Sequence, residues 1–285
     1  MSDDACLACG SDAGFDPTLD TLARCRRCGF VTYQGASGVE PPALYDEAYF
    51  HGAEYPDYRG QEPGIRRSMR RHLRQMARFA PLRGALLEIG CAYGFFLAEA
   101  RAHFGRVVGT DVSDAALTHA REALGLDVRA GDFPSLDLGT ERFDVVCLWD
   151  TLEHLARPDA YLRRAHDVLA PGGSVFLTTG DIGSWNARLR GAGWRLIHPP
   201  THLHYFSRAT IGRLLERSGF RVAGVETAGY YHTLFSVLGS LQIRGGATGR
   251  LAARAAAVLG PRLTNRIGAF VNLGDIMFVA ATRVA

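Results

Sequence analysis

Short apolar runs alternate with longer patterned stretches over most of the chain after residue 84. The run that begins at Ala85 has the length of a buried strand. A tight turn from Gly90 to Gly94 then leads into an apolar helical pattern that starts at Phe95. Further strands are predicted at residues 106–110, 126–130, 143–148, 174–179, 220–227 and 275–284. Strands that alternate with helices in this way predict an α/β fold with a doubly wound sheet.

A helix is predicted at Gly64–Pro81, ahead of the first of these strands. Its apolar stripe consists of Ile65, Met69, Leu73, Met76 and Ala80. Arginines fill the remaining positions, and a solvated face is the favoured interpretation of them. A surface that meets phosphates of a nucleotide-linked substrate or of RNA is the alternative. Residues 41–83 are thus predicted to form a linker and a capping helix.

The segment 228–274 separates the last two predicted strands and has a helical, amphipathic pattern. It is predicted to be a helical insertion within a domain that spans residues 84–285. A packed lid over a substrate is the favoured role, because leucine stripes are more often core than surface. A dimer face and a contact with a membrane surface are the alternatives.

Acidic residues follow two of the predicted strands. Asp111 lies about 20 residues after the glycine turn, where a carboxylate can accept hydrogen bonds from both hydroxyls of a ribose. Asp132 follows the next strand, where a carboxylate can bond an exocyclic amine and the ring of Phe133 can flank a purine. The carboxyl edge of the sheet is therefore the predicted ligand site.

The stretches LLEIGCAYG, VVGTDVS, AGDF, FDVVCLWDTLEHL and LAPGG occur in this order between residues 86 and 173. In order and spacing they resemble the motifs of the class I S-adenosylmethionine-dependent methyltransferases. The resemblance covers roughly Ala85 to Phe220. It implies a seven-stranded, mostly parallel sheet and S-adenosylmethionine as the cofactor.

The resemblance also implies which residues meet the cofactor. Glu88 and Gly90 are expected under the methionine part, Asp111 at the ribose, and Asp132 with Phe133 at the adenine. The remaining residues of the expected cofactor site are Ala92, Gly94, Val112 and Trp149, with Asp150 beside the transferred methyl group. Ala92 stands where the family more commonly has glycine, and its methyl group is small enough to keep the assignment. Aromatic residues between 45 and 58 are candidates to cover the methionine end, with ordinary packing as the alternative.

Four cysteines near the N-terminus have the spacing C-x2-C-x15-C-x2-C, formed by Cys6, Cys9, Cys25 and Cys28. Two such pairs place four thiolates around one tetrahedral ion, which predicts a zinc-binding module over residues 1–40. Two disulfides are the alternative, and a reducing compartment disfavours them. Cysteine at every ligand position indicates a closed structural site. A similar module precedes the methyltransferase domain of sugar methyltransferases.

The segment 180–205 follows the fifth predicted strand and is rich in aromatic residues and histidines. His202 is the favoured general base for a hydroxyl acceptor, because histidine accepts protons near pH 7. His204 lies two residues on, so on an extended segment it faces the same side and is a second catalytic candidate, with Asp150 as a third. Trp194 and Tyr205 are expected to shape the pocket. Histidines that only bond the loop backbone are the alternative.

Charge and hydropathy narrow the possible partners. The net charge is only +3, and all 32 basic residues are arginine, which indicates a coding bias rather than selection for phosphate binding. A nucleic-acid partner is therefore unlikely on this basis. The start of the chain lacks an apolar signal region, and no run of about 18 uncharged apolar residues occurs. A cytoplasmic protein is expected, and a homodimer is possible.

These observations favour a methyltransferase that acts on a hydroxyl of a small molecule, such as a sugar or a secondary metabolite. A C-methyltransferase that acts on a nucleotide-linked deoxysugar is the first alternative. The second is an RNA methyltransferase that grips nucleic acid with its zinc ribbon. A binding protein that has lost a methyltransferase activity is the third.

Overall fold

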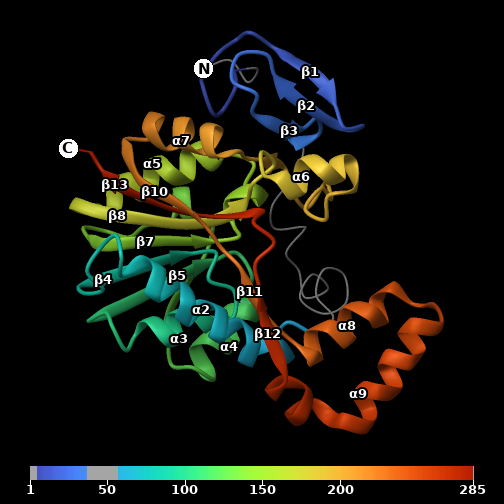
Figure 1. Cartoon of the computed structure of the whole chain (residues 1–285). Coiled ribbons are helices and arrows are strands. Elements are labelled where there is room, and N and C mark those ends of the chain that lie inside the picture. Colours follow the sequence, from blue (N-terminus) through green and yellow to red (C-terminus); the bar gives the residue numbers. More distant parts are fainter. Residues whose placement is uncertain (1–4, 37–56, 285) are drawn as a thin grey trace.

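The computed structural model describes residues 5–36 and 57–284 of the chain. Seven strands form one sheet in the order β10-β13-β8-β7-β4-β5-β6 (Figure 1). Their bounds are β4 Ala85–Ile89, β5 Arg106–Asp111, β6 Asp127–Ala130, β7 Phe143–Trp149, β8 Leu169–Gly180, β10 Phe220–Thr227 and β13 Ile276–Arg283. Six of these strands run in one direction, and β13 runs antiparallel to them between β10 and β8. The predicted doubly wound, mostly parallel sheet is confirmed.

Helices cover both faces of the sheet (Figure 1). One face carries α2 Glu62–Met76, α3 Phe95–Ala100 and α4 Asp114–Glu122, and the other carries α5 Pro158–Val168 and α7 Arg208–Arg217. Successive residues of β4 point to opposite faces, so Leu86 packs with the first group and Leu87 with the second. Burial on both faces explains why the central strands are continuous apolar runs rather than alternating ones.

The helix predicted at Gly64–Pro81 begins two residues earlier and ends at Met76. Met69, Leu73 and Met76 are buried in the core, as the apolar stripe predicts. Ser207 caps α7, because its hydroxyl accepts a hydrogen bond from the amide of Thr210.

The insertion between the last two strands is a ribbon that carries two helices. Strands β11 Tyr230–Thr233 and β12 Gly268–Val271 pair antiparallel, and α8 Leu234–Arg244 and α9 Gly246–Arg266 connect them. A kink at Gly260 divides α9. The ribbon lies against α2, whereas α8 and α9 project away from the large sheet (Figure 1). The segment predicted to be helical therefore also contains two strands.

The N-terminal cysteine segment forms a small sheet with the order β1-β2-β3-β9. Its own strands are β1 Phe15–Thr18, β2 Leu22–Cys25 and β3 Val31–Tyr33, and β9 His204–Tyr205 comes from the segment after β8. Phe30 joins the core of the α5 and α7 face, where its ring lies 5.4 Å from that of Phe206. The cysteine segment is therefore built into the body of the molecule.

The remaining helical elements are short. Helix α6 spans Trp185–Arg190, and single 3-10 turns occur at Arg59–Gln61, Phe133–Ser135, Leu152–His154 and Gly191–Gly193. Within the described part of the chain, every helix is too short or too polar to cross a bilayer.

Candidate functional site

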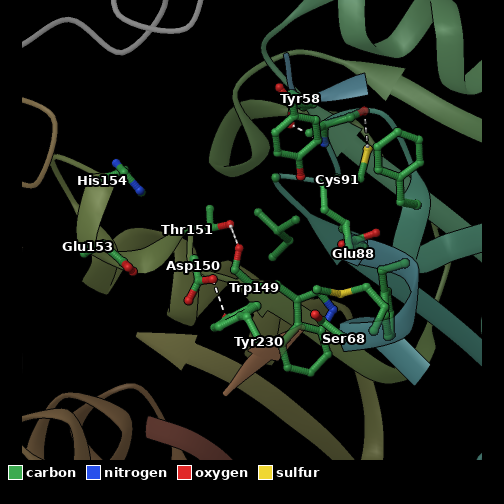
Figure 2. Close-up of a pocket in the computed structure, with 18 of the residues that line it drawn as sticks. Tyr58, Ser68, Glu88, Cys91, Trp149, Asp150, Thr151, Glu153, His154 and Tyr230 are labelled. Atoms are coloured by element: carbon green, nitrogen blue, oxygen red, sulfur yellow. Dashed lines mark hydrogen bonds between the residues drawn. The ribbon is translucent and has the colours of Figure 1, made fainter. Parts of the chain in front are cut away.

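A cavity of about 470 Å³ opens at the carboxyl ends of β4, β5 and β7 (Figure 2). One end is lined by the turn after β4 and by the ends of β5 and β6. The other end is lined by β11, by the 3-10 turn after β7 and by residues 195–202. Ligands of doubly wound sheets bind at this edge.

The turn after β4 has a backbone that favours glycine. Gly90 and Gly94 have φ values of +73° and +76°. A Cβ on Gly90 would lie 2.7 Å from the side chain of Thr151, and one on Gly94 would lie 2.5 Å from Leu126. Ala92 also has a positive φ, +44°, although it carries a methyl group. The turn thus passes close to the loop that follows β7 on one side and to the start of β6 on the other.

Asp111 braces this turn from the end of β5. One carboxylate oxygen accepts a hydrogen bond of 2.8 Å from the amide of Ala92, and the other accepts one of 2.9 Å from the amide of Ser113. Burial raises the pKa of Asp111, and these amide hydrogen bonds oppose the shift. Each oxygen keeps a second lone pair, which can accept a ribose hydroxyl.

Glu88 lies inside the cavity wall with its side chain almost fully buried (Figure 2). Its Oε2 has no hydrogen-bond partner among the described residues. Burial and the charge of Asp111 raise the pKa of Glu88 well above its ordinary value. A buried carboxylate without a partner is costly, so this oxygen indicates a polar ligand group in the cavity.

Phe133, which is expected at the adenine, lines the cavity, and so does Val112 of the expected cofactor site. Asp132 does not line it, and its carboxylate instead accepts a hydrogen bond from the hydroxyl of Tyr161, which does. Trp149 lines the middle of the cavity and stacks on His72, with ring centroids 4.9 Å apart.

Asp150 forms a partly buried network with residues from two other elements (Figure 2). Its Oδ1 accepts a 2.8 Å hydrogen bond from the hydroxyl of Thr178, and its Oδ2 accepts one from the hydroxyl of Tyr230. Burial raises the pKa of Asp150, and both hydroxyls oppose this shift. Tyr230 thereby ties the insertion to the carboxyl edge of the large sheet.

Glu153, His154 and His202 meet at the end of the cavity away from Glu88. One possible ligand atom of each lies within 4.8 Å of the others. The rings of His154 and His202 are 4.6 Å apart, and that of His198 lies 3.9 Å from His202. Burial lowers the pKa of His202 well below its ordinary value. His202 is therefore neutral near pH 7, but it is a weaker base than an exposed histidine.

His204 lies outside the cavity lining, in the pair of strands β3 and β9. Its Nδ1 is 3.0 Å from the hydroxyl of Thr32, and its ring packs 5.5 Å from that of Phe30. Trp194 and Tyr205 are also absent from the cavity lining, and they pack with Leu22 and Val31 of the cysteine segment. The two histidines therefore do not share one face, since the chain is not yet extended at His202.

The four N-terminal cysteines converge. The sulfur atoms of Cys6 and Cys28 are 3.6 Å apart, and those of Cys9 and Cys25 are 3.9 Å apart. Sulfur atoms bound to one tetrahedral zinc at about 2.3 Å lie about 3.8 Å from each other. All four cysteines are free thiols. The arrangement matches a four-thiolate metal site better than the disulfide alternative.

Sequence reasoning missed Tyr230 and did not place Glu153 beside His202. Tyr230 belongs to the insertion, about 80 residues beyond Asp150, and no local pattern links the two. Glu153 lies in the motif WDTLEHL, but its position beside His202 depends on how the segment 195–202 folds. The aromatic residues between 45 and 56 lie outside the described residues, whereas Tyr58 lines the cavity.

A family model for a methyltransferase domain matches residues 59–225. The chain belongs to this methyltransferase family. A ubiquinone biosynthesis O-methyltransferase of Ruegeria pomeroyi is 41% identical over 107 residues, which are 35% of this chain and 42% of the relative. The chain spans about half the length or less of the curated relatives it matches. Residues 59–225 are thus a methyltransferase domain of this family.

Solved structures agree on the fold. A crystal structure of a putative methyltransferase from Bacillus halodurans has a TM-score of 0.54 at 14% identity and covers 77% of this chain and 100% of its own. The magnesium protoporphyrin IX methyltransferase of Synechocystis, solved with bound SAH, has a TM-score of 0.50 at 13% identity and covers 76% and 83% of the two chains.

The residues of the cavity fit S-adenosylmethionine. Asp111 offers lone pairs for the ribose, Phe133 an apolar wall for the adenine, and Glu88 an unpartnered carboxylate oxygen for the cationic methionine end. Bound there, the cofactor supplies a methyl group on a sulfonium, a good leaving group.

Proposed function

We propose that this methyltransferase transfers a methyl group to a hydroxyl of a small molecule. The observation that carries the proposal is the single cavity, because it joins the cofactor end at Asp111 to an end lined by Glu153 and His202. Its volume of about 470 Å³ suits a cofactor with a small acceptor rather than a polymer. The name of the Ruegeria relative, an O-methyltransferase, supports oxygen as the acceptor atom.

The residues at the acceptor end hold the acceptor molecule in place and do not attack it themselves. Tyr230 and Thr178 hold Asp150 beside the end of β7, and Trp149 forms an apolar wall next to it. Such walls exclude water and orient the acceptor, which is the main contribution that a protein makes to an in-line transfer.

Methyl-labelled S-adenosylmethionine and a fractionated cell extract test this function. We expect the label in a low-molecular-weight product, with the new methyl group bound to oxygen. Asp111→Ala serves as the control, because it weakens the cofactor end and lowers the labelling. Label in RNA, or on carbon or nitrogen of the product, would contradict the proposal.

We further propose that Cys6, Cys9, Cys25 and Cys28 hold a structural zinc ion. Their sulfur separations and their status as free thiols support this. All four ligand positions are protein thiolates, so the ion has no open position for a substrate. Its role is to fix the small sheet that β9 completes.

A further inference from the structure

The acceptor end of the cavity holds an acidic and imidazole cluster whose ligand atoms converge. Glu153 and His202 are 4% and 8% exposed, and His154 is 9% exposed. These three side chains come from the 3-10 turn after β7 and from the segment before β9. Separate elements therefore bring their ligand atoms within 4.8 Å of one another.

Backbone carbonyls orient both imidazoles. Nδ1 of His154 donates a 2.9 Å hydrogen bond to the carbonyl of Thr201, and Nδ1 of His202 donates a 2.8 Å bond to the carbonyl of Leu196. In a neutral ring this fixes the proton on Nδ1 and leaves the lone pair on Nε2. A carbonyl partner on the other nitrogen is the usual support of a metal-binding histidine.

One oxygen of the Glu153 carboxylate has no partner among the described residues. This oxygen is Oε2, and the side chain that carries it is buried. The second carboxylate nearby, that of Asp150, is partly buried and accepts hydrogen bonds from the hydroxyls of Thr178 and Tyr230. Arg195 is the one arginine among the described residues that line the cavity, and its guanidinium is engaged by Asp275. Buried charges are normally paired or bound to metal, so a cation bound between these side chains would give Oε2 of Glu153 a partner.

We propose that Glu153, His154 and His202 bind a divalent cation that holds the oxygen atoms of the methyl acceptor. Two imidazole nitrogens and one carboxylate leave further coordination positions open, as catalytic metal sites do. An acceptor with two neighbouring oxygen atoms fills two adjacent positions. This inference rests on the proposed function for the identity of the acceptor atom, but not for the existence of the site.

The cation would promote the loss of the proton from the acceptor hydroxyl, a task for which His202 alone is a weak base. A hydroxyl bound to a divalent cation would release its proton to water more readily, and the oxygen would keep the electron pair that forms the new bond to the methyl carbon. The bond from that carbon to the sulfonium sulfur breaks at the same time, and its electron pair leaves on the sulfur of S-adenosylhomocysteine. His202 then acts as a ligand rather than as the base. The site also neutralises the buried carboxylate.

Cobalt binding to the untagged, zinc-loaded full chain tests the site directly. Equilibrium dialysis with Co²⁺ should give about one additional ion per chain, without the intense near-ultraviolet absorption of cobalt thiolates that binding to the cysteines would produce. Glu153→Gln and His202→Gln should each weaken Co²⁺ binding by at least about 10–100-fold. His204→Gln is the matched control, since His204 is buried two residues away but lies outside the cavity, and it should bind Co²⁺ within about threefold of the parent.

Calorimetry with S-adenosylhomocysteine shows whether each variant is folded. Unchanged cofactor affinity together with lost Co²⁺ binding supports the site. Absence of stoichiometric Co²⁺ binding by the parent chain overturns it, and so does unchanged binding by a folded Glu153→Gln variant. A failure of the proposed function looks different, because Co²⁺ then binds but no hydroxyl acceptor is methylated.

Discussion

Asp111 lies at the carboxyl end of β5, where its carboxylate accepts hydrogen bonds from the amides of Ala92 and Ser113. It could be selected from the sequence as a candidate for the cofactor end, because parallel strands all end at one edge and a polar residue after a strand lies at that edge. His202 could be selected as well, but its neighbours could not. Glu153 and Tyr230 reach the same cavity through a 3-10 turn and a distant insertion, and neither arrangement has a local pattern.

Asp111 permits a direct test of the cofactor end. Asp111→Ala removes the acceptor for the ribose hydroxyls and the brace on the amides of Ala92 and Ser113. Because those groups are then left unpaired in a largely buried site, we expect S-adenosylhomocysteine to bind about 5–150-fold more weakly, equivalent to about 1–3 kcal/mol. Calorimetry measures this. Asp167→Ala, on an exposed side chain, is the control. An unchanged affinity would place the ribose elsewhere.

Tyr230 tests the link between the insertion and the large sheet. Tyr230→Phe deletes the hydroxyl that donates to Asp150 and leaves that carboxylate oxygen buried. The free energy of unfolding should fall by about 1–3 kcal/mol, as when a hydrogen bond to a charged group is lost. Tyr231→Phe is the matched control, since the hydroxyl of Tyr231 bonds the exposed carbonyl of Gly268 and its loss should cost less than about 1 kcal/mol. Urea unfolding compares the two, and equal losses would argue against a buried network.

At the scale of elements, the pattern of apolar residues predicted the strands of the large sheet. It did not predict the structure of the irregular segment around His202. The central strands are buried on both faces, so their apolar runs are unambiguous. Two-residue alternation assumes an extended chain, whereas the amide of His202 bonds back to the carbonyl of His198 and β9 begins only at His204. The strands β11 and β12 were missed for a similar reason, since four residues beside long helices carry little pattern.

Helix α5 provides a prediction about pH. Burial alone would raise the pKa of Asp159, but hydrogen bonds from Arg157 and Arg163 outweigh it and lower this pKa to about 2. The ordinary value is about 3.9, so the unfolded chain binds the proton more tightly. The carboxylate therefore contributes about 2 kcal/mol above pH 5, and this contribution is lost as the pH falls from about 4 toward 2.

Asp159→Asn isolates this contribution. The variant should be less stable than the parent by about 2 kcal/mol at pH 7, and the difference should narrow when both are measured near pH 3.5. Denaturant unfolding at the two pH values checks the expectation. A difference that stays constant would mean that the arginine pairs do not depend on the charge of Asp159.

At the scale of the whole molecule, the cysteine segment and the methyltransferase domain form one structure. Strand β3 pairs with β9, and Arg217 of α7 donates hydrogen bonds to the carbonyls of Cys6 and Leu7. The carbonyl of Leu203 accepts hydrogen bonds from the amide of Tyr33 and the hydroxyl of Thr32. Leu203 follows His202 directly, so the cysteine segment holds the backbone of the acceptor end.

Removal of one cysteine should therefore act at a distance. Cys25→Ser takes away one thiolate of the proposed zinc site, and structural zinc binding is worth on the order of 10 kcal/mol of folding free energy. We expect the purified parent to carry zinc bound by thiolates and the variant to lose about one ion per chain. Because β3 then no longer holds Leu203 firmly, turnover should fall while the affinity for S-adenosylhomocysteine, at the other end of the cavity, stays within a few-fold. Metal analysis, calorimetry and a methylation assay measure the three quantities.

Cys147→Ser is the control, since Cys147 lies in β7 away from the cluster and the variant should keep its zinc. Retention of zinc by Cys25→Ser would refute the site, and unchanged turnover after zinc loss would show that the segment does not position His202.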